Sequence, residues 1–211
     1  MPSRTQAVLE PRKSPVQARS AASVDALLEA TIQVLLRHGK EQLTTTKVAM
    51  RAGVSVGTLY QYFPNKSALL QAALERHLEG VAATVERSCE ELNGRTHPEM
   101  IDALFTAFLH AKMRDRQTSL ALHSVSSDVE GARIVRQMAA RFHRAIVRML
   151  ASSCDKPPTD PELAAFMLVG AMGGISRSLL ESGAPAERFE TVRRELILLG
   201  CGYLSAPRPL R

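Results

Sequence analysis

Residues 44–66 read TTTKVAMRAGVSVGTLYQYFPNK, and this stretch predicts two short helices joined by a glycine turn. Thr44 is a residue type that caps helix N-termini, and Gly53 supplies the left-handed conformation that a tight helix exit needs. Ser55 can cap the second helix in the same way, while Val54 fills the space between the two helices. This layout is typical of a helix-turn-helix unit, whose second helix enters the major groove of DNA.

The segment closely resembles the DNA-binding signature of the tetracycline-repressor (TetR/AcrR) family of bacterial regulators. The resemblance is carried by the capping Thr44 followed by Val48-Ala49, by AGVS at residues 52–55, and by GTLY-x-YF-x-x-K at residues 57–66. It covers residues 20 to 70. The chain departs from the family's usual pattern just upstream, where Lys40 follows Gly39 in place of an aromatic residue. The resemblance implies a homodimeric repressor with a helical effector domain.

Each exposed residue of the unit also has an expected role of its own. The first turn of the second helix should lie nearest the bases, whereas Gln61 is suited to hydrogen-bond readout. Tyr60, Tyr62 and Lys66 are placed to clamp phosphates. The alternatives are plain aromatic packing for Tyr60 and a solvated surface charge for Lys66. The complete set of expected DNA-binding residues is Thr44, Thr45, Thr46, Lys47, Ser55, Val56, Gly57, Thr58, Tyr60, Gln61, Tyr62 and Lys66.

The positive charge of the chain is concentrated near its N-terminus. Residues 1–70 hold nine Lys or Arg against four Asp or Glu, whereas the rest of the chain holds 18 against 17. We therefore expect residues 1–19 to form a flexible basic arm that attracts phosphates or enters the minor groove, or else a plain solvated tail. The DNA-binding domain is expected over residues 20–66. No apolar segment follows the basic leader, so no secretory signal is predicted.

The hydrophobic periodicity predicts an all-α protein of about nine helices with no strand. Three helices would form the DNA-binding domain, the first beginning between residues 20 and 23, and the others a regulatory and dimerisation domain over residues 67–205. A long helix from Lys66 to Leu92 would link the two domains mechanically. Residues 206–211 are expected to be a disordered tail.

The helix expected from Leu163 to Leu180 is apolar on more than one face, which predicts that it is covered from two sides. Three glycines in its middle would permit close approach of another helix. Two copies of this helix and of the last helix would make a four-helix dimer interface, while the alternative is an intramolecular core helix. The interface residues expected are Phe166, Gly170, Gly173, Gly174, Val192, Leu196 and Leu199.

Phenylalanine and methionine are concentrated on two neighbouring helices of the second domain. Such a deformable lining suits a small, largely apolar effector, although the same stripes are common in ordinary cores. The expected lining is Phe105, Phe108, Met113, Met138, Phe142 and Met149, and His110, Arg141 and His143 could orient a polar end of the ligand. The resemblance implies that such an effector changes the spacing of the recognition helices.

Motifs for catalysis, metal binding or cofactor binding are absent from the sequence, so we predict neither an enzyme nor a bound cofactor. The chain has three widely spaced cysteines, Cys89, Cys154 and Cys201, and no two of them form a CxxC pair. This cysteine pattern favours a reducing, cytoplasmic location. The longest uncharged run has fourteen residues, which is short for a membrane span. The predicted partners are double-stranded operator DNA, a second copy of the chain and a small-molecule effector, without a membrane. The alternative is a helical scaffold that docks a protein instead of DNA, and the pattern leaves repression and activation equally open.

Overall fold

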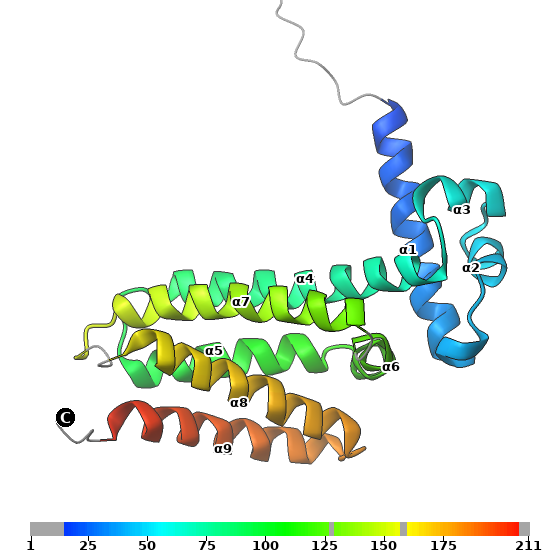
Figure 1. Cartoon of the computed structure of the whole chain (residues 1–211). Helices are drawn as coiled ribbons and strands as arrows, with labels where there is room; N and C mark the ends of the chain where they lie inside the picture. The colour runs from blue at the N-terminus through cyan, green and yellow to red at the C-terminus, as the bar shows by residue number, and fades with distance from the viewer. Residues whose placement is uncertain (1–14, 127–128, 157–159, 207–211) are drawn as a thin grey trace, which may run out of the picture.

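The computed structural model describes residues 15–126, 129–156 and 160–206, and within these residues it contains nine helices and no strand. Figure 1 shows a small N-terminal unit that projects from one end of a longer helical body. The all-α prediction is therefore confirmed. The helices are α1 (Pro15–Gln42), α2 (Thr45–Ala52), α3 (Val56–Tyr62), α4 (Lys66–Glu91), α5 (His97–Met113), α6 (Arg116–Ser126), α7 (Val129–Ala151), α8 (Pro161–Glu181) and α9 (Ala186–Ser205).

The turn between α2 and α3 has the geometry that its sequence predicted. The Thr44 side chain accepts a hydrogen bond from the Lys47 backbone N–H, and Ser55 accepts one from the Thr58 N–H at 3.0 Å. Gly53 ends α2 with φ of 69°, a conformation that costs glycine little. The buried Leu59 and Val48 join the shared core of the unit.

Helix α1 begins at Pro15, five to eight residues before the predicted start, so residues 15–19 are helical and do not belong to a flexible arm. The physical reason is that proline is pre-organised for the first turn of a helix, a signal that the Pro- and Ser-containing leader concealed. At its other end the helical conformation is interrupted at Gly39, with φ of 74° and ψ of 169°. The expected arm over residues 1–14 lies outside the described residues.

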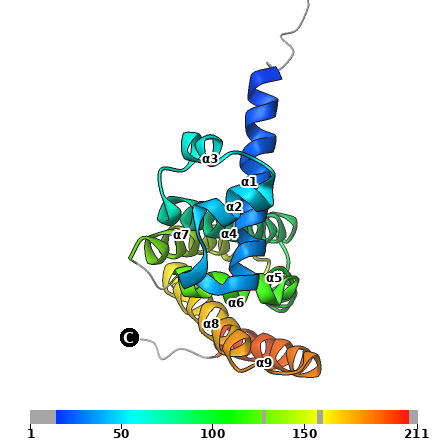
Figure 2. The ribbon, with the colours of Figure 1, turned by 90° about the vertical axis from the view of Figure 1, so that its right-hand side faces the viewer.

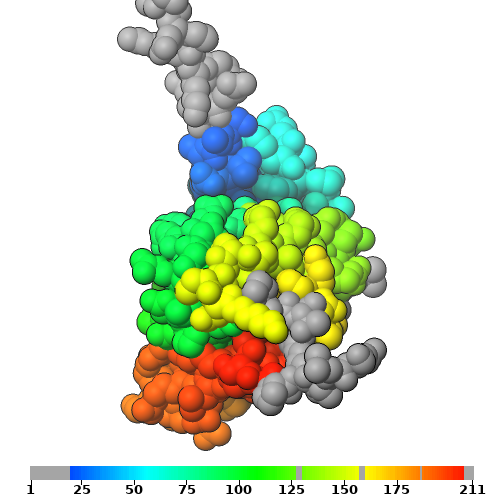
Figure 3. Space-filling view, turned by 90° about the vertical axis from the view of Figure 1, so that its left-hand side faces the viewer, coloured from blue at the N-terminus to red at the C-terminus, as the bar shows by residue number. Residues whose placement is uncertain are grey.

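The body of the protein is a bundle in which α4 packs on α5 and α7, and α8 and α9 form the side farthest from α4 (Figure 1). Figure 2, viewed from the end that carries the N-terminal unit, shows α6 beneath α1 and α9 at the bottom of the view, below α8. The space-filling view in Figure 3 shows the N-terminal unit as a separate projection at the top and α9 along the opposite side. One hydrophobic core runs through both parts of the protein.

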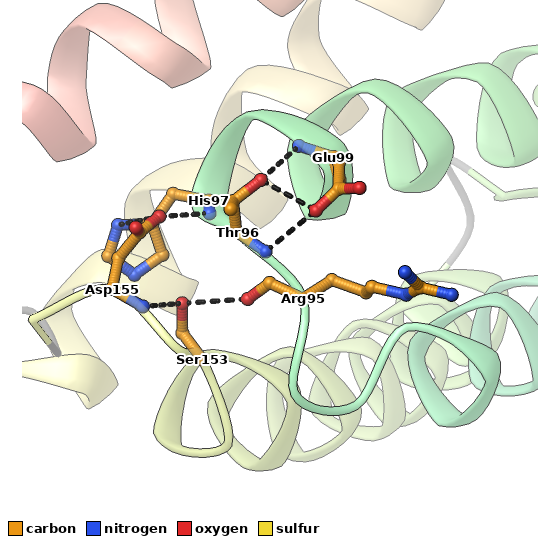
Figure 4. A network of polar contacts seen from close by, with 6 residues as sticks. All are labelled: Arg95, Thr96, His97, Glu99, Ser153 and Asp155. Carbon is orange, nitrogen blue, oxygen red and sulfur yellow. Dashed lines mark hydrogen bonds and ion pairs between the residues drawn. The ribbon is translucent and has the colours of Figure 1, made fainter.

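The end of the bundle that carries the loop between α4 and α5 is fixed by polar contacts (Figure 4). Thr96 and Glu99 form a capping box at the start of α5, in which each side chain accepts a backbone N–H from the other residue. The His97 backbone N–H donates to Asp155 Oδ2 at 2.6 Å, and the Asp155 N–H donates to Ser153. These bonds tie the α5 N-terminus to the segment after α7.

Helix α8 is the one described helix that is long and apolar enough to cross a membrane, by length and composition alone. One of its faces is buried against the bundle and includes Ala164, Leu168 and Met172. Its opposite face is exposed. The prediction of a helix covered from two sides is therefore met within the chain on one side only.

Candidate DNA-binding surface and ligand cavity

The outer face of α3 is exposed and uncharged, and the whole stretch from Gln42 to Leu74 contains no Asp or Glu. Ser55, Gly57 and Gln61 are exposed, so these predicted contact residues are free to approach DNA. Val56 is half-buried and packs against the core of the unit, which limits its reach towards a base edge. Thr58 is also half-buried, and its hydroxyl lies 2.8 Å from the Ser55 hydroxyl.

Two lysines that were predicted to contact DNA hold the end of α1 in this structure. Lys47 Nζ donates to the Gln42 carbonyl oxygen at 2.9 Å, and Lys66 Nζ donates to the Glu41 carbonyl at 3.2 Å. Cations near the C-terminus of a helix are favourable because its last carbonyls lack intrahelical partners. Both ammonium groups therefore have a structural role that the sequence did not indicate.

The two tyrosines of α3 differ in their surroundings. Tyr60 is 50% exposed, and its hydroxyl lies 3.1 Å from the Thr45 hydroxyl on α2. Tyr62 is half-buried and packs against the core. Thr44 and Thr46 are exposed.

A largely apolar cavity of about 400 Å³ lies inside the second domain, within the size range of small-molecule sites. Five helices, α4 to α8, contribute to its wall. Phe108, Met138 and Phe142 line it, as predicted, and the two phenylalanine rings meet edge to face with centroids 6.0 Å apart. The apolar lining of the cavity therefore comes in part from α5 and in part from α7.

The other three residues predicted to line the ligand site do not reach this cavity. Phe105 and Met149 are fully buried in the core, and Met113 borders a second, more open hollow between α4 and α5. The stripe pattern could not separate core from cavity, because both require apolar side chains at helical spacing. Arg141 does not orient a ligand either, since its guanidinium hydrogen-bonds to Glu79 and Glu86, and His143 bonds to the Glu162 carbonyl.

The cavity touches the two helices of the body that contact α1. Its wall includes Leu74 and Leu78 of α4 and Leu122 of α6, and both helices pack against α1. On the outer surface Arg76 of α4 forms an ion pair with Asp25 of α1 at 3.1 Å. A ligand that displaced α4 or α6 would therefore act directly on α1, the helix that packs against α2.

His77 connects three helices at the cavity wall. Its Nε2 lies 3.0 Å from the Ser119 hydroxyl, which itself donates to the Lys112 carbonyl at 2.7 Å. Because the only proton of that hydroxyl is used, His77 must donate from Nε2. Burial, followed by the charge of Lys112, lowers the pKa of His77 to about 4, so the imidazole is neutral at pH 7.

Helices α8 and α9 both expose large apolar side chains on their outer face. Phe166 and Leu199 of the predicted interface are 66% and 52% exposed, and Leu198, which the sequence reasoning missed, is 65% exposed. Leu196 is 1% exposed and belongs to the core against α5, so its assignment to the interface was wrong. Val192 is half-buried.

The three predicted interface glycines are exposed, and a Cβ atom built on Gly170, Gly173 or Gly174 would meet no atom within 4 Å. Contacts within one chain therefore do not require glycine at these positions. Gly173 and Gly174 also border the cavity, a second role that the sequence did not reveal.

The cysteines and other potential ligand groups show no metal site in the described part of the chain. Burial raises the pKa of the Cys89 thiol to about 12, so this cysteine is an inert part of the core. Cys154 is exposed and Cys201 is half-buried.

Comparison with known protein families identifies both parts of the chain. Residues 27–73 match the N-terminal model of the tetR family of bacterial regulatory proteins, and residues 96–204 match a tetracyclin repressor-like C-terminal domain. The chain belongs to the tetR family. Members of this family are DNA-binding transcription regulators, in agreement with the regulator that the sequence predicted.

Individual relatives agree with this assignment. The transcriptional repressor KstR of Rhodococcus jostii RHA1 is 30% identical over 145 residues, which are 68% of this chain and 65% of KstR. KstR of Mycolicibacterium smegmatis is 44% identical over 62 residues, 29% of this chain and 30% of that protein. The chain thus spans less than two thirds of the KstR sequences it matches. The regulator BetI of Vibrio campbellii is 27% identical over 79% of this chain and 85% of BetI.

Solved structures of the tetR family share the fold. The fatty acid degradation regulator FadR of Bacillus halodurans has a TM-score of 0.67 at 19% identity, covering 87% of this chain and 99% of FadR. FadR of Bacillus subtilis, solved in complex with stearoyl-CoA, has the same TM-score at 17% identity and the same coverage. At these identities the likeness supports the tetR fold alone.

Proposed function

We propose that this protein is a cytoplasmic, homodimeric transcriptional repressor that binds a palindromic operator through α3 and is released from it by a small apolar effector. The observation that carries the proposal is the apolar cavity whose wall is formed in part by α4 and α6, the helices that contact α1. The tetR family and the similarity to the repressor KstR support the DNA-binding half of the proposal.

The DNA contacts are proposed for the exposed residues of the unit. Ser55, Gly57 and Gln61 would face base edges, while Tyr60 and the two lysines that hold α1 would approach phosphates. Lys47 and Lys66 donate to carbonyls through one proton each, and an ammonium group has three. Thr44, Thr45, Thr46, Val56, Thr58 and Tyr62 complete the proposed surface, with Val56 and Tyr62 as packing supports.

The exposed apolar face of α8 and α9 is proposed as the dimer interface. Leu163, Phe166 and Met167 of α8 and Leu198 and Leu199 of α9 are exposed large apolar side chains. Covering this face with its own copy would remove a large apolar patch from water, and the exposed glycines would let the helices approach closely. A two-fold dimer would present its two α3 helices to half-sites related by the same symmetry.

The energetics of release need only a modest preference. An effector that binds the DNA-incompetent arrangement a hundredfold better supplies about 2.7 kcal/mol of coupling between the two sites. Expansion of the cavity wall at α4 and α6 is the proposed source of that coupling.

The test combines operator binding with a variant that fills the cavity. Hydrophobic compounds that raise the melting temperature are titrated against the protein bound to a duplex from upstream of its own gene. Ala139 lines the cavity on α7, whereas the adjacent Ala140 is exposed and does not. We expect Ala139→Phe to bind the duplex and lose release by the compounds, and Ala140→Phe to behave as wild type. The proposal fails if the stabilising compounds leave operator affinity unchanged in the wild-type protein.

A further inference from the structure

The polar part of the cavity wall carries positive charge. Lys112, near the end of α5, and Arg177 on α8 both line the cavity. No Asp or Glu belongs to the wall among the described residues. Two histidines also line the cavity. His77 is neutral at pH 7, and His123 Nε2 lies 2.9 Å from Glu181 Oε1, so the nearby carboxylate of Glu181 is engaged outside the cavity wall.

Neither Lys112 nor Arg177 has an anionic partner in the described part of the structure. The hydrogen bonds and ion pairs found there include none from the Lys112 ammonium or the Arg177 guanidinium. Arg141 and Arg193, for comparison, each hydrogen-bond to carboxylates. Lys112 is half-buried in the cavity wall, so its ammonium group lacks both a carboxylate partner and full contact with water.

The position is unfavourable for an ammonium group. Burial lowers the pKa of Lys112, and the charge of Arg177 lowers it further. A lysine whose stem covers apolar surface normally extends its head group towards water. This behaviour explains a single lysine in the cavity wall, but it does not explain a second cation beside it. A neutral ligand would remove more water from Lys112 without supplying a partner. An anion would offset both the loss of hydration at Lys112 and its repulsion from Arg177.

We propose that the effector of this cavity is an amphipathic anion, with its apolar body among Phe108, Met138 and Phe142 and one carboxylate or phosphate group between Lys112 and Arg177. This inference names the class of ligand that the cavity binds. It rests on the proposed function, because that proposal makes the cavity an effector site. The carboxylate and the phosphate share the required chemistry, an oxyanion that accepts charge-assisted hydrogen bonds from two cations.

The test compares four probes with the same twelve-carbon tail, namely dodecanoate, dodecyl phosphate, dodecanol and dodecylammonium. Their binding to the full-length protein is measured by titration calorimetry without DNA and below the micelle concentrations. At least one of the two anions should bind tenfold or more tightly than dodecanol, at one molecule per chain, and dodecylammonium should bind most weakly. Comparison of dodecanoate with dodecyl phosphate identifies the preferred head group.

Charge variants then locate the head group. Lys112→Met keeps the length and apolar character of the side chain, and it should reduce the preference for the anion over dodecanol about tenfold. Arg177→Met removes an exposed charge and should give a smaller loss, and it provides a second reading should Lys112→Met fail to fold. Arg136→Met is the matched control, because Arg136 is an exposed cation of α7 outside the cavity wall.

The proposal is overturned if dodecanol binds as tightly as both anions, or if Lys112→Met and Arg177→Met keep the full anion preference. A loss in Arg136→Met equal to that in Lys112→Met would also overturn it, because general attraction to a basic surface would then explain the result. A gel shift with the upstream duplex separates this outcome from the proposed function. Anion binding that leaves operator affinity unchanged would refute ligand-responsive release while the ligand class stood.

Discussion

The packing of α9 on α5 gives a prediction that the structure makes quantitative, the effect of Gly200→Ala. Gly200 is buried, and a Cβ atom there would lie 2.8 Å from both Ile101 Cγ2 and Phe105 Cε2. Carbon atoms in good contact are about 3.5–4.0 Å apart. Because Ile101 and Phe105 are themselves fully buried, neither side chain has room to withdraw.

The magnitude follows from two opposing terms. Overpacking a buried contact costs about 1–3 kcal/mol, while replacing glycine by alanine inside a helix gains about 1 kcal/mol. Gly202, two residues along the same helix, is the matched control, because a Cβ atom there would meet nothing within 4 Å. Gly202→Ala should therefore keep the helix gain without the clash, and the two variants should differ by about 1–3 kcal/mol.

The assay is thermal unfolding of both variants and the wild-type protein, followed by circular dichroism at one fixed protein concentration. For a chain of this size each kcal/mol shifts the midpoint by about 2–4 °C, so Gly200→Ala should melt several degrees below Gly202→Ala. A midpoint for Gly200→Ala equal to or above that of Gly202→Ala would refute the close packing of α9 on α5.

Three further predictions concern DNA contacts, pH and assembly. Lys66→Met should weaken binding to all duplexes and lower the salt-dependence slope by about 1, and an unchanged slope would leave that lysine with its structural role alone. Gln61→Ala should instead change the preference at one base pair by about 1–3 kcal/mol. The pKa of His77 is about 4 in the folded protein and 6.5 in the unfolded chain. Between these pH values the imidazole is therefore protonated in the unfolded chain but not in the folded protein. The free energy of unfolding should therefore fall by up to about 1.4 kcal/mol per pH unit as pH drops from 6.5 to 4, and His77→Gln should flatten that fall in urea titrations, an identical slope contradicting the assignment. Phe166→Glu places a charge on the exposed face of α8 and should yield monomers by light scattering with unchanged helix content, and a fully dimeric variant would move the interface elsewhere.

The local signals of the N-terminal unit predicted its structure well. The caps at Thr44 and Ser55 and the left-handed turn at Gly53 act within four residues of the backbone they fix, so the sequence alone contains the information. The same holds for the capping Asp160 with Pro161 at the start of α8. Local hydrogen bonds thus fixed the element boundaries.

The assignment of apolar residues to core, cavity or interface could not be read from periodicity. Helix α9 has two apolar sides, one with Leu196 against α5 and one with Leu198 exposed, and the sequence pattern does not distinguish them. Phe105 and Phe108 are likewise one turn apart on α5, yet the first is core and the second lines the cavity. Which side faces which neighbour depends on the packing of five helices.

The charged end of the cavity was also beyond the sequence. Lys112 and Arg177 are 65 residues apart and meet only because α5 and α8 converge. One signal was present, a lysine in the last turn of α5, and it has meaning only once the cavity beside it is known. Arg141 and His143 seemed equally suitable from their place on α7, but both are bound to other groups.

The most direct test of the central claim is a footprint of the wild-type protein on the duplex upstream of its own gene. A dimer that reads DNA through two α3 helices should protect a pair of half-sites with inverted symmetry, about one helical turn or a multiple of it apart. Protection of a single asymmetric site shorter than about one helical turn by a monomer, or no sequence-specific protection of any duplex offered, would contradict it.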